Sequence, residues 1–71
     1  MNNNIEHPTP AFMCILRLCG MEKQDILQMT ALLKTAENMN KVVDKLEAKD
    51  FKLTPQETMK ICAEVIKESK A

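Results

Sequence analysis

Four side chains in this sequence could bind a zinc ion: His7, Cys14, Cys19 and Cys62. A closed structural zinc site needs its ligands to converge, usually with two cysteines held close together in a turn. Cys14 and Cys19 are five residues apart on one predicted helix, so they point about 140° apart around its axis. Side chains that diverge in this way do not readily chelate one ion or form a disulfide with each other. We therefore expect no bound metal or cofactor, and we interpret the cysteines as buried thiols that act as small hydrophobic residues.

Catalytic chemistry has equally little support in the sequence. A nucleophilic cysteine needs a positioned base, and the only histidine, His7, lies in a polar segment at the N-terminal end. The carboxylates fall beside lysines on predicted solvent-exposed helix faces, not in a dry pocket where a general acid–base pair operates. These carboxylates are Glu37, Asp44, Glu47, Glu57 and Glu64. The sequence therefore predicts a protein that is not an enzyme.

The composition is that of one small domain. The chain has 71 residues, and its ten basic and ten acidic side chains intermingle and balance to zero net charge. It has no basic stripe that would attract nucleic acid or a membrane surface, and no apolar run near the ~20 residues of a membrane span. Three cysteines are too few for a secreted disulfide scaffold, and the first residues lack the pattern of a secretory signal. We therefore expect a cytoplasmic protein.

The central stretch from Ile26 to Leu46 has the three- and four-residue spacing of apolar side chains that is typical of amphipathic helices. Its apolar residues form two faces, rotated by about 100° from each other. The first face contains Ile26, Met29 and Leu33, and the second contains Leu32, Ala36, Met39, Val43 and Leu46. A break at Lys34–Thr35 explains both faces, because Thr35 can cap a new helix and Lys34 suits the end of the preceding one. One long helix is the alternative.

The first helix is predicted between Thr9, which can act as its N-cap, and Gly20, which fits the left-handed position just past its end. The polar residues 1–8 that precede it are expected to form a flexible leader. Residues 9–71 then form a single helical domain.

The last helix has the clearest start signal. Thr54 and Glu57 form a capping box around Pro55, and the residues of the preceding connector, Phe51 and Leu53, are expected to tuck under the bundle. The inward stripe of this helix is predicted to contain Met59, Cys62, Ala63 and Ile66, widened by Ile61 and Val65. No strand pattern is present. The fold class is therefore all-α, a small bundle of three to four short helices, with the first helix, the Leu32–Leu46 face and the last helix forming the core.

The first helix is apolar on nearly every side. The face with Phe12 and Leu16 can cover the core, whereas Met13 and Leu18 would then stay exposed, although a longer last helix could cover them. A chain this short has a small core and gains stability from a partner. We therefore expect a small non-catalytic protein-interaction module, an adaptor, inhibitor or regulator, that forms a homodimer or binds an unidentified protein. The residues expected to contact the partner are Met13, Arg17, Leu18, Gly20 and Met21.

A helix-turn-helix DNA-binding transcriptional regulator is the alternative from another functional class. Its recognition helix would present Gln56, Glu57, Lys60, Glu64 and Lys67. Gln56 could read adenine, but Glu57 and Glu64 would face phosphates, and zero net charge leaves little non-specific affinity for DNA. The sequence therefore disfavours a nucleic-acid partner.

A family resemblance lies between Leu16 and Leu46. It is carried by Leu16, Cys19-Gly20-Met21, Asn38, Val42-Val43 and Leu46. This pattern resembles the ubiquitin-associated domain, which has a Met-Gly-Phe/Tyr loop after its first helix, an Asn before its third and a closing apolar pair with Leu. Here Cys replaces the loop Met, Met replaces the aromatic residue, and the stretch is about two residues longer. The resemblance covers under half of the chain and implies ubiquitin binding through Gly20-Met21 and the third helix.

Overall fold

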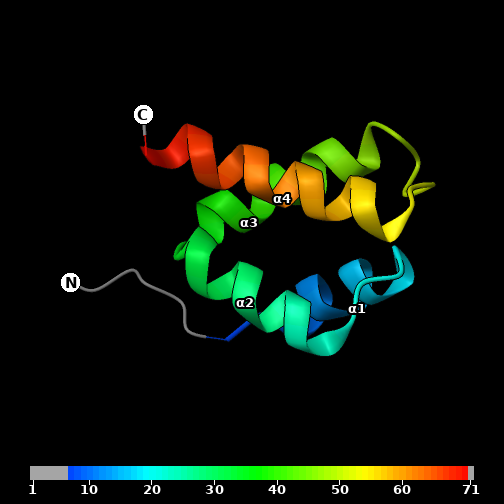
Figure 1. Ribbon diagram of the computed structural model, residues 1–71, viewed down its shortest axis with the longest axis horizontal. Helices are drawn as coiled ribbons and strands as arrows, with labels where there is room; N and C mark the ends of the chain where they lie inside the picture. Colours follow the sequence, from blue (N-terminus) through cyan, green and yellow to red (C-terminus); the bar gives the residue numbers. More distant parts are fainter. Residues whose placement is uncertain (1–6, 71) are drawn as a thin grey trace.

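The structure is a computed structural model that describes residues 7–70, and within this range it contains four α-helices and no strand. The helices are α1 (Pro10–Leu18), α2 (Lys23–Leu33), α3 (Ala36–Glu47) and α4 (Pro55–Lys70). α4 packs on α3 and α2, while α1 packs on α2 and to a smaller extent on α3 (Figure 1). The predicted all-α bundle is confirmed. Of the predicted leader, residues 1–6 lie outside the described residues.

The central stretch forms two helices, as the two apolar faces predicted. Lys34 has a positive φ of 72°, and its backbone N–H donates to the carbonyl oxygen of Thr30 at 3.0 Å. The hydroxyl of Thr35 then accepts the backbone N–H of Asn38 at 3.2 Å, and the side-chain amide of Asn38 donates to the carbonyl oxygen of Leu33 at 2.6 Å. The Asn38 side chain therefore satisfies a free carbonyl group at the end of α2, and the Thr35 hydroxyl satisfies a free amide at the start of α3.

The predicted N-caps of α1 and α4 are also confirmed. The hydroxyl of Thr9 accepts the backbone N–H of Phe12 at 3.2 Å. At α4 the capping box is complete: the hydroxyl of Thr54 accepts the backbone N–H of Glu57 at 3.2 Å, and the Glu57 carboxylate accepts the backbone N–H of Thr54 at 3.2 Å. Each cap pairs an amide that the helix itself leaves without a partner.

The end of α1 explains the position of Met21. The backbone N–H of Gly20, with φ of 89°, donates to the Arg17 carbonyl oxygen at 2.9 Å, and that of Met21 donates to the Leu16 carbonyl oxygen at 3.1 Å. This pair of bonds is the Schellman motif, in which the residue after the left-handed position packs against a residue in the last turn of the helix. Met21 and Leu16 are accordingly both buried.

The end of α3 repeats this motif without a glycine. The backbone N–H of Asp50 donates to the Glu47 carbonyl oxygen at 2.9 Å, and that of Phe51 donates to the Leu46 carbonyl oxygen at 2.9 Å. Asp50 and Phe51 both have positive φ, 55° and 57°. These two left-handed residues reverse the chain so that the Phe51 ring stays at the edge of the core, 39% exposed. The expectation that Phe51 tucks under the bundle is therefore wrong, while Leu53 is half-buried.

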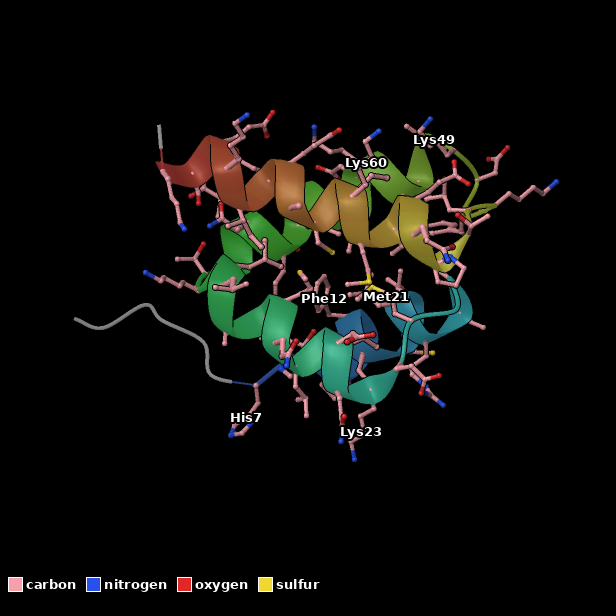
Figure 2. All side chains as sticks on the ribbon, viewed as in Figure 1. His7, Phe12, Met21, Lys23, Lys49 and Lys60 are labelled. Carbon is pink, nitrogen blue, oxygen red and sulfur yellow. The ribbon has the colours of Figure 1, made fainter. Side chains whose placement is uncertain are left out.

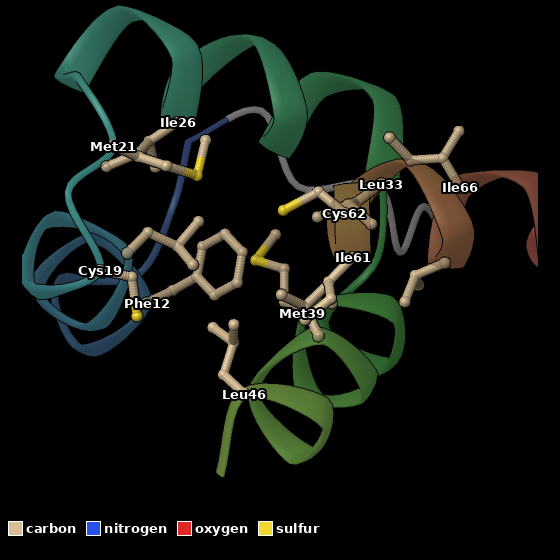
Figure 3. Close-up of a cluster of buried hydrophobic side chains, with 13 residues drawn as sticks. Phe12, Cys19, Met21, Ile26, Leu33, Met39, Leu46, Ile61, Cys62 and Ile66 are labelled. Carbon is tan, nitrogen blue, oxygen red and sulfur yellow. The ribbon is translucent and has the colours of Figure 1, made fainter. Parts of the chain in front are cut away.

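The core lies between the four helices. Figure 2 shows Phe12 and Met21 pointing between the helices, whereas Lys23, Lys49 and Lys60 point away from the bundle. The ring of Phe12 enters the apolar cluster from α1, and Met39 enters it from α3 (Figure 3). The fully or nearly buried apolar residues are Phe12, Leu16, Cys19, Met21, Ile26, Leu33, Met39, Val42, Leu46, Ile61, Cys62, Val65 and Ile66.

The contribution of α2 to the core differs from the prediction. α2 buries Ile26, Thr30 and Leu33, whereas Leu32 is 46% exposed and Ala36 is exposed. The predicted Leu32–Leu46 face is therefore wrong at its first two positions, because the break at residue 34 lets each helix orient its own stripe. The hydroxyl of Thr30 is tolerated in the core because it donates to the carbonyl oxygen of Ile26 at 2.8 Å.

The buried stripe of α4 confirms the prediction at Ile61, Cys62, Val65 and Ile66. It also contains Thr58, whereas Ala63 is exposed and Met59 is half-buried, so the prediction is wrong at Ala63. The hydroxyl of Thr58 donates to the carbonyl oxygen of Thr54 at 3.0 Å, so a polar residue can take a core position. The sequence prediction excluded Thr58 because it considered apolar residues alone.

Candidate functional site

The outward side of α1 is apolar apart from one charged residue, Arg17. α1 turns Phe12 and Leu16 toward the core, and Cys19, its C-cap, is buried as well. The exposed residues on the opposite side are Ala11, Cys14, Arg17 and Leu18, while Ile15 is half-buried and packs against the core. We call Ala11, Cys14, Ile15 and Leu18 the α1 outer face. Leu18 is 79% exposed, the most exposed large apolar side chain in the described residues.

A groove between α1 and α3 adjoins this face. It has a volume of about 210 Å³ and is lined by Thr9, Ala11, Phe12, Ile15, Ala36, Met39, Asn40 and Val43. Ala11 and Ile15 belong to both the groove and the α1 outer face, so the two form one continuous apolar surface. We call this hollow the α1–α3 groove. Ligand pockets for drug-sized molecules usually exceed about 300 Å³, so the groove suits a single apolar side chain better than a cofactor.

Of the five residues predicted to contact a partner, the structure exposes three, half-buries one and buries one. Arg17, Leu18 and Gly20 are exposed at the C-terminal end of α1, and Met13 is half-buried against the core. Met21 is only 3% exposed and belongs to the core, because its position after Gly20 directs it onto Leu16. Met21 is therefore closed to a partner in this structure, including the ubiquitin contact that the family resemblance implied.

Several residues of this surface were missed in the sequence analysis. Ala11, Cys14 and Leu18 have the i, i+3, i+7 spacing of one helix face, and this signal was present in the sequence. The contribution of Ala36 and Val43 from α3 had no such signal, because it depends on how α3 lies beside α1.

A further exposed side chain, the ring of Phe51, lies at the turn that follows α3. The thiol of Cys19 lies 3.9 Å from the carbonyl oxygen of Phe51, which brings the turn after α1 beside the turn after α3. The ring of Phe51 is therefore at the same end of the molecule as Leu18, although 33 residues separate them in the sequence.

The thiols differ in their surroundings. Cys14 is exposed, so the expectation of buried thiols is wrong for this residue, whereas Cys19 and Cys62 are buried as expected. Burial raises the pKa of the Cys62 thiol to about 11, with a smaller contribution from the neighbouring Cys19. A buried thiol that holds its proton is a poor nucleophile. Within residues 7–70, no three side chains of the His, Cys, Asp and Glu types gather where they could hold a metal ion.

The carboxylates form ordinary helix-surface interactions. Glu37 lies 4.0 Å from Lys41, one turn further along α3. Lys45 on α3 reaches two carboxylates of α4, Glu64 at 3.9 Å and Glu68 at 3.7 Å. These contacts link α3 to α4 on an exposed surface, where such pairs contribute well under about 1 kcal/mol each.

The charges of α4 also bear on the helix-turn-helix alternative. The backbone N–H and the hydroxyl of Thr54 bind the Glu57 carboxylate and lower the pKa of that carboxyl group, with further lowering from Lys49 and Lys60. Glu57 therefore carries a full negative charge at neutral pH. A recognition helix with this residue in its first turn would place the charge near DNA phosphates, which repel it.

Comparisons of the chain with protein-family models, with curated proteins and with solved structures find no match. None of the helices in residues 7–70 combines the length and the apolar character needed to cross a membrane.

Proposed function

We propose that this protein is a small non-catalytic protein-interaction module that binds its partner through the α1 outer face and the adjoining α1–α3 groove. The observation that carries the proposal is Leu18, which is 79% exposed on the same side of α1 as the exposed Ala11 and Cys14. Burying a leucine side chain contributes about 1.5–3 kcal/mol, which is about a fifth to a third of the binding free energy of a micromolar complex.

Exposed apolar residues are common on proteins, and their surroundings distinguish a contact surface from an isolated side chain. Leu32 is also exposed, at 46%, but it lies among polar groups of the α2–α3 turn and the end of α4, including Lys34 and Lys70. Leu18 instead shares its face with Ala11 and Cys14. This difference favours the α1 outer face as the contact surface, and it makes Leu32 a matched control.

DNA binding has less support than protein binding. The net charge of the chain is zero, so counterion release, the main source of affinity for DNA, is weak. On α4, Lys60 and Lys67 alternate with Glu57, Glu64 and Glu68. No positively charged stripe supports a nucleic-acid role.

Site-specific photo-crosslinking tests the proposal. We would place p-benzoylphenylalanine at Arg17, beside the α1 outer face, or at Lys60, which points away from the bundle on α4 (Figure 2). The probe at position 17 should give protein adducts in a lysate of cells that express the chain, whether the adduct contains a second copy or another protein. The adducts should disappear with Leu18→Glu and persist with Leu32→Glu. Equal yields from positions 17 and 60, or adducts that survive Leu18→Glu, would overturn the proposal.

A further inference from the structure

We propose that α1 is a redox-sensitive switch, in which Cys14 and Cys19 form a disulfide that requires α1 to unwind. Cys14 is exposed on the outward side of α1, and Cys19 is the buried C-cap of the same helix. The disulfide and the folded α1 exclude each other, so the oxidised chain has α2, α3 and α4 packed together and α1 unwound. The switch does not depend on the proposed function, although unwinding removes the α1 outer face.

The folded helix holds the two thiols apart. The backbone N–H of Cys19 donates to the Ile15 carbonyl oxygen at 3.1 Å, so Cys19 continues the helical path of α1. In an α-helix, residues five apart have Cα atoms about 8.6 Å apart and side chains that point about 140° apart. A disulfide usually joins Cα atoms that lie within about 6.8 Å and Cβ atoms that face each other. The bridge therefore requires that the turn between Cys14 and Cys19 unwinds.

Unwinding this turn removes the whole of α1. The helix has nine residues, and a bridge from Cys14 to Cys19 leaves only residues 10–13 in a single turn. A lone turn does not persist, because it fixes several backbone dihedrals for one hydrogen bond. The bridged segment also contains Leu16, whose carbonyl oxygen accepts the backbone N–H of Met21 at 3.1 Å. Forming the disulfide therefore opens the Schellman motif and releases Leu16 from the core.

The other three helices hold each other more firmly than they hold α1. Arg17, the single charged residue of α1, takes part in no ion pair among the described residues, and α1 has little contact with α4. By contrast, Lys45 links α3 to α4 through two carboxylates, and the Asn38 side chain links α3 to the end of α2. Nine of the thirteen core residues lie on α2, α3 and α4. These helices therefore keep a shared core when α1 unwinds.

The oxidant is a small disulfide such as glutathione disulfide. The exposed Cys14 thiolate attacks one of its sulfur atoms, which forms a mixed disulfide and releases one glutathione. When α1 unwinds, the Cys19 thiolate attacks the Cys14 sulfur atom of the mixed disulfide and releases the second glutathione. The chain loses two electrons and two protons, and glutathione disulfide gains both. Cys19 is thus the resolving cysteine of an exposed thiol.

Equilibration of the purified chain in glutathione buffers of increasing oxidised fraction, with acid quenching and mass mapping of peptides, tests for the disulfide. The chain should first carry one glutathione on Cys14 and then show the Cys14–Cys19 disulfide. Cys19→Ala, checked for helicity by circular dichroism, should stop at the glutathione adduct on Cys14. A wild-type chain that keeps this adduct at every buffer ratio, or that forms a disulfide through Cys62 instead, overturns the proposal.

Two N-cap variants test whether α1 unwinds alone. Thr9 caps α1 and Thr54 caps α4, and each hydroxyl accepts a backbone N–H at 3.2 Å. The unwound α1 has already lost its cap, so Thr9→Ala should raise the equilibrium constant for the disulfide about fivefold, the factor that corresponds to about 1 kcal/mol per cap. Thr54→Ala should leave this constant unchanged, because α4 stays folded. Equal increases in both variants would show that the disulfide forms from the globally unfolded chain, which rules out the switch.

NMR spectra of the oxidised chain test the proposed product. The amide signals of α1 should lose their helical chemical shifts, whereas those of α3 and α4 should keep theirs. A disulfide-bonded chain in which α1 stays helical, or in which all four helices unfold, contradicts the proposal. Photo-adducts from position 17 of the reduced chain report on the proposed function separately, so either proposal can fail without the other.

Discussion

Gly20 packs directly against the ring of Pro55: a Cβ atom added to Gly20 would lie 2.8 Å from the Cγ atom of Pro55. This contact joins the turn after α1 to the first residue of α4. Gly20 also has a φ of 89°, a left-handed conformation that residues with a Cβ rarely adopt. The chain therefore has its single glycine where both the backbone and the neighbouring ring require it.

Gly20→Ala should destabilise the protein by about 1–2 kcal/mol from the left-handed backbone alone, with a further loss from the contact with Pro55. In a domain of this size each kcal/mol lowers the thermal midpoint by roughly 4–8 °C. A double-mutant cycle with Pro55→Ala, measured by thermal unfolding, separates the two effects. The cost of Gly20→Ala should be smaller in the Pro55→Ala background. An equal cost in both backgrounds would show that the ring contact contributes nothing.

Asp50→Gly should stabilise the protein, in contrast to Gly20→Ala. Asp50 occupies the left-handed position of the α3 Schellman motif with a φ of 55°, and glycine removes the steric cost of that conformation. We expect a gain of about 1 kcal/mol in the free energy of unfolding, measured by urea titration. Lys49→Gly is the matched control: Lys49 has no positive φ, so glycine there should destabilise by about 0.5–1 kcal/mol. A gain at both positions would contradict this account.

Thr54→Ala should cost about 1 kcal/mol, because it removes the hydroxyl that accepts the backbone N–H of Glu57. Thr54→Ser keeps this hydroxyl and should cost only a few tenths of a kcal/mol. The pKa of Glu57 is lowered in the folded state, so its contribution is present above its unfolded pKa near 4.5 and is lost as the pH falls through its folded value. The difference between the wild type and Thr54→Ala, followed by thermal unfolding, should therefore shrink in acid. If the difference does not change with pH, the stabilisation by the Thr54 cap does not depend on the ionisation of Glu57.

Alkaline pH should destabilise the protein through Cys62. Burial raises the pKa of this thiol from 9.0 to about 11, so between these values the unfolded chain releases a proton that the folded chain retains. The free energy of unfolding should therefore fall by roughly 2–3 kcal/mol between pH 8 and pH 11 from this group. Cys62→Ala should flatten the dependence, whereas the exposed Cys14→Ala should keep it. Urea titrations at fixed pH values measure the free energy of unfolding of the wild type and of both variants. If this free energy falls equally with pH in all three proteins, Cys62 is not the cause of the dependence.

The sequence by itself determined where α1, α3 and α4 begin and where α1 and α2 end. Thr9, Thr35 and Thr54 are N-caps whose hydroxyls accept amides three residues ahead, and this interaction is local enough to be predicted from composition and spacing. The break at Lys34 and the end of α1 at Gly20 were predictable for the same reason. Local hydrogen bonds and backbone preferences involve neighbours in the sequence, so they do not depend on the rest of the fold.

The tertiary structure alone decided which residues at the margins of each predicted helix face are buried. A residue such as Leu32 or Thr58 is apolar or polar in any context, but its burial depends on how the helices pack together. Leu32 is exposed because the break at residue 34 frees α2 to turn another stripe inward. Thr58 is buried because α4 itself satisfies its hydroxyl.

The candidate site also has one part that the sequence predicted and another that only helix packing decided. The exposure of Leu18 was expected from the sequence, because its spacing along α1 places it away from Phe12 and Leu16. The α1–α3 groove does not follow, because Ile15 and Val43 are 28 residues apart and only the packing of two helices brings them together. Met21 was expected at the surface and is buried, because the turn at Gly20 directs it onto Leu16. Helix periodicity is a property of one segment, whereas a groove is a property of two.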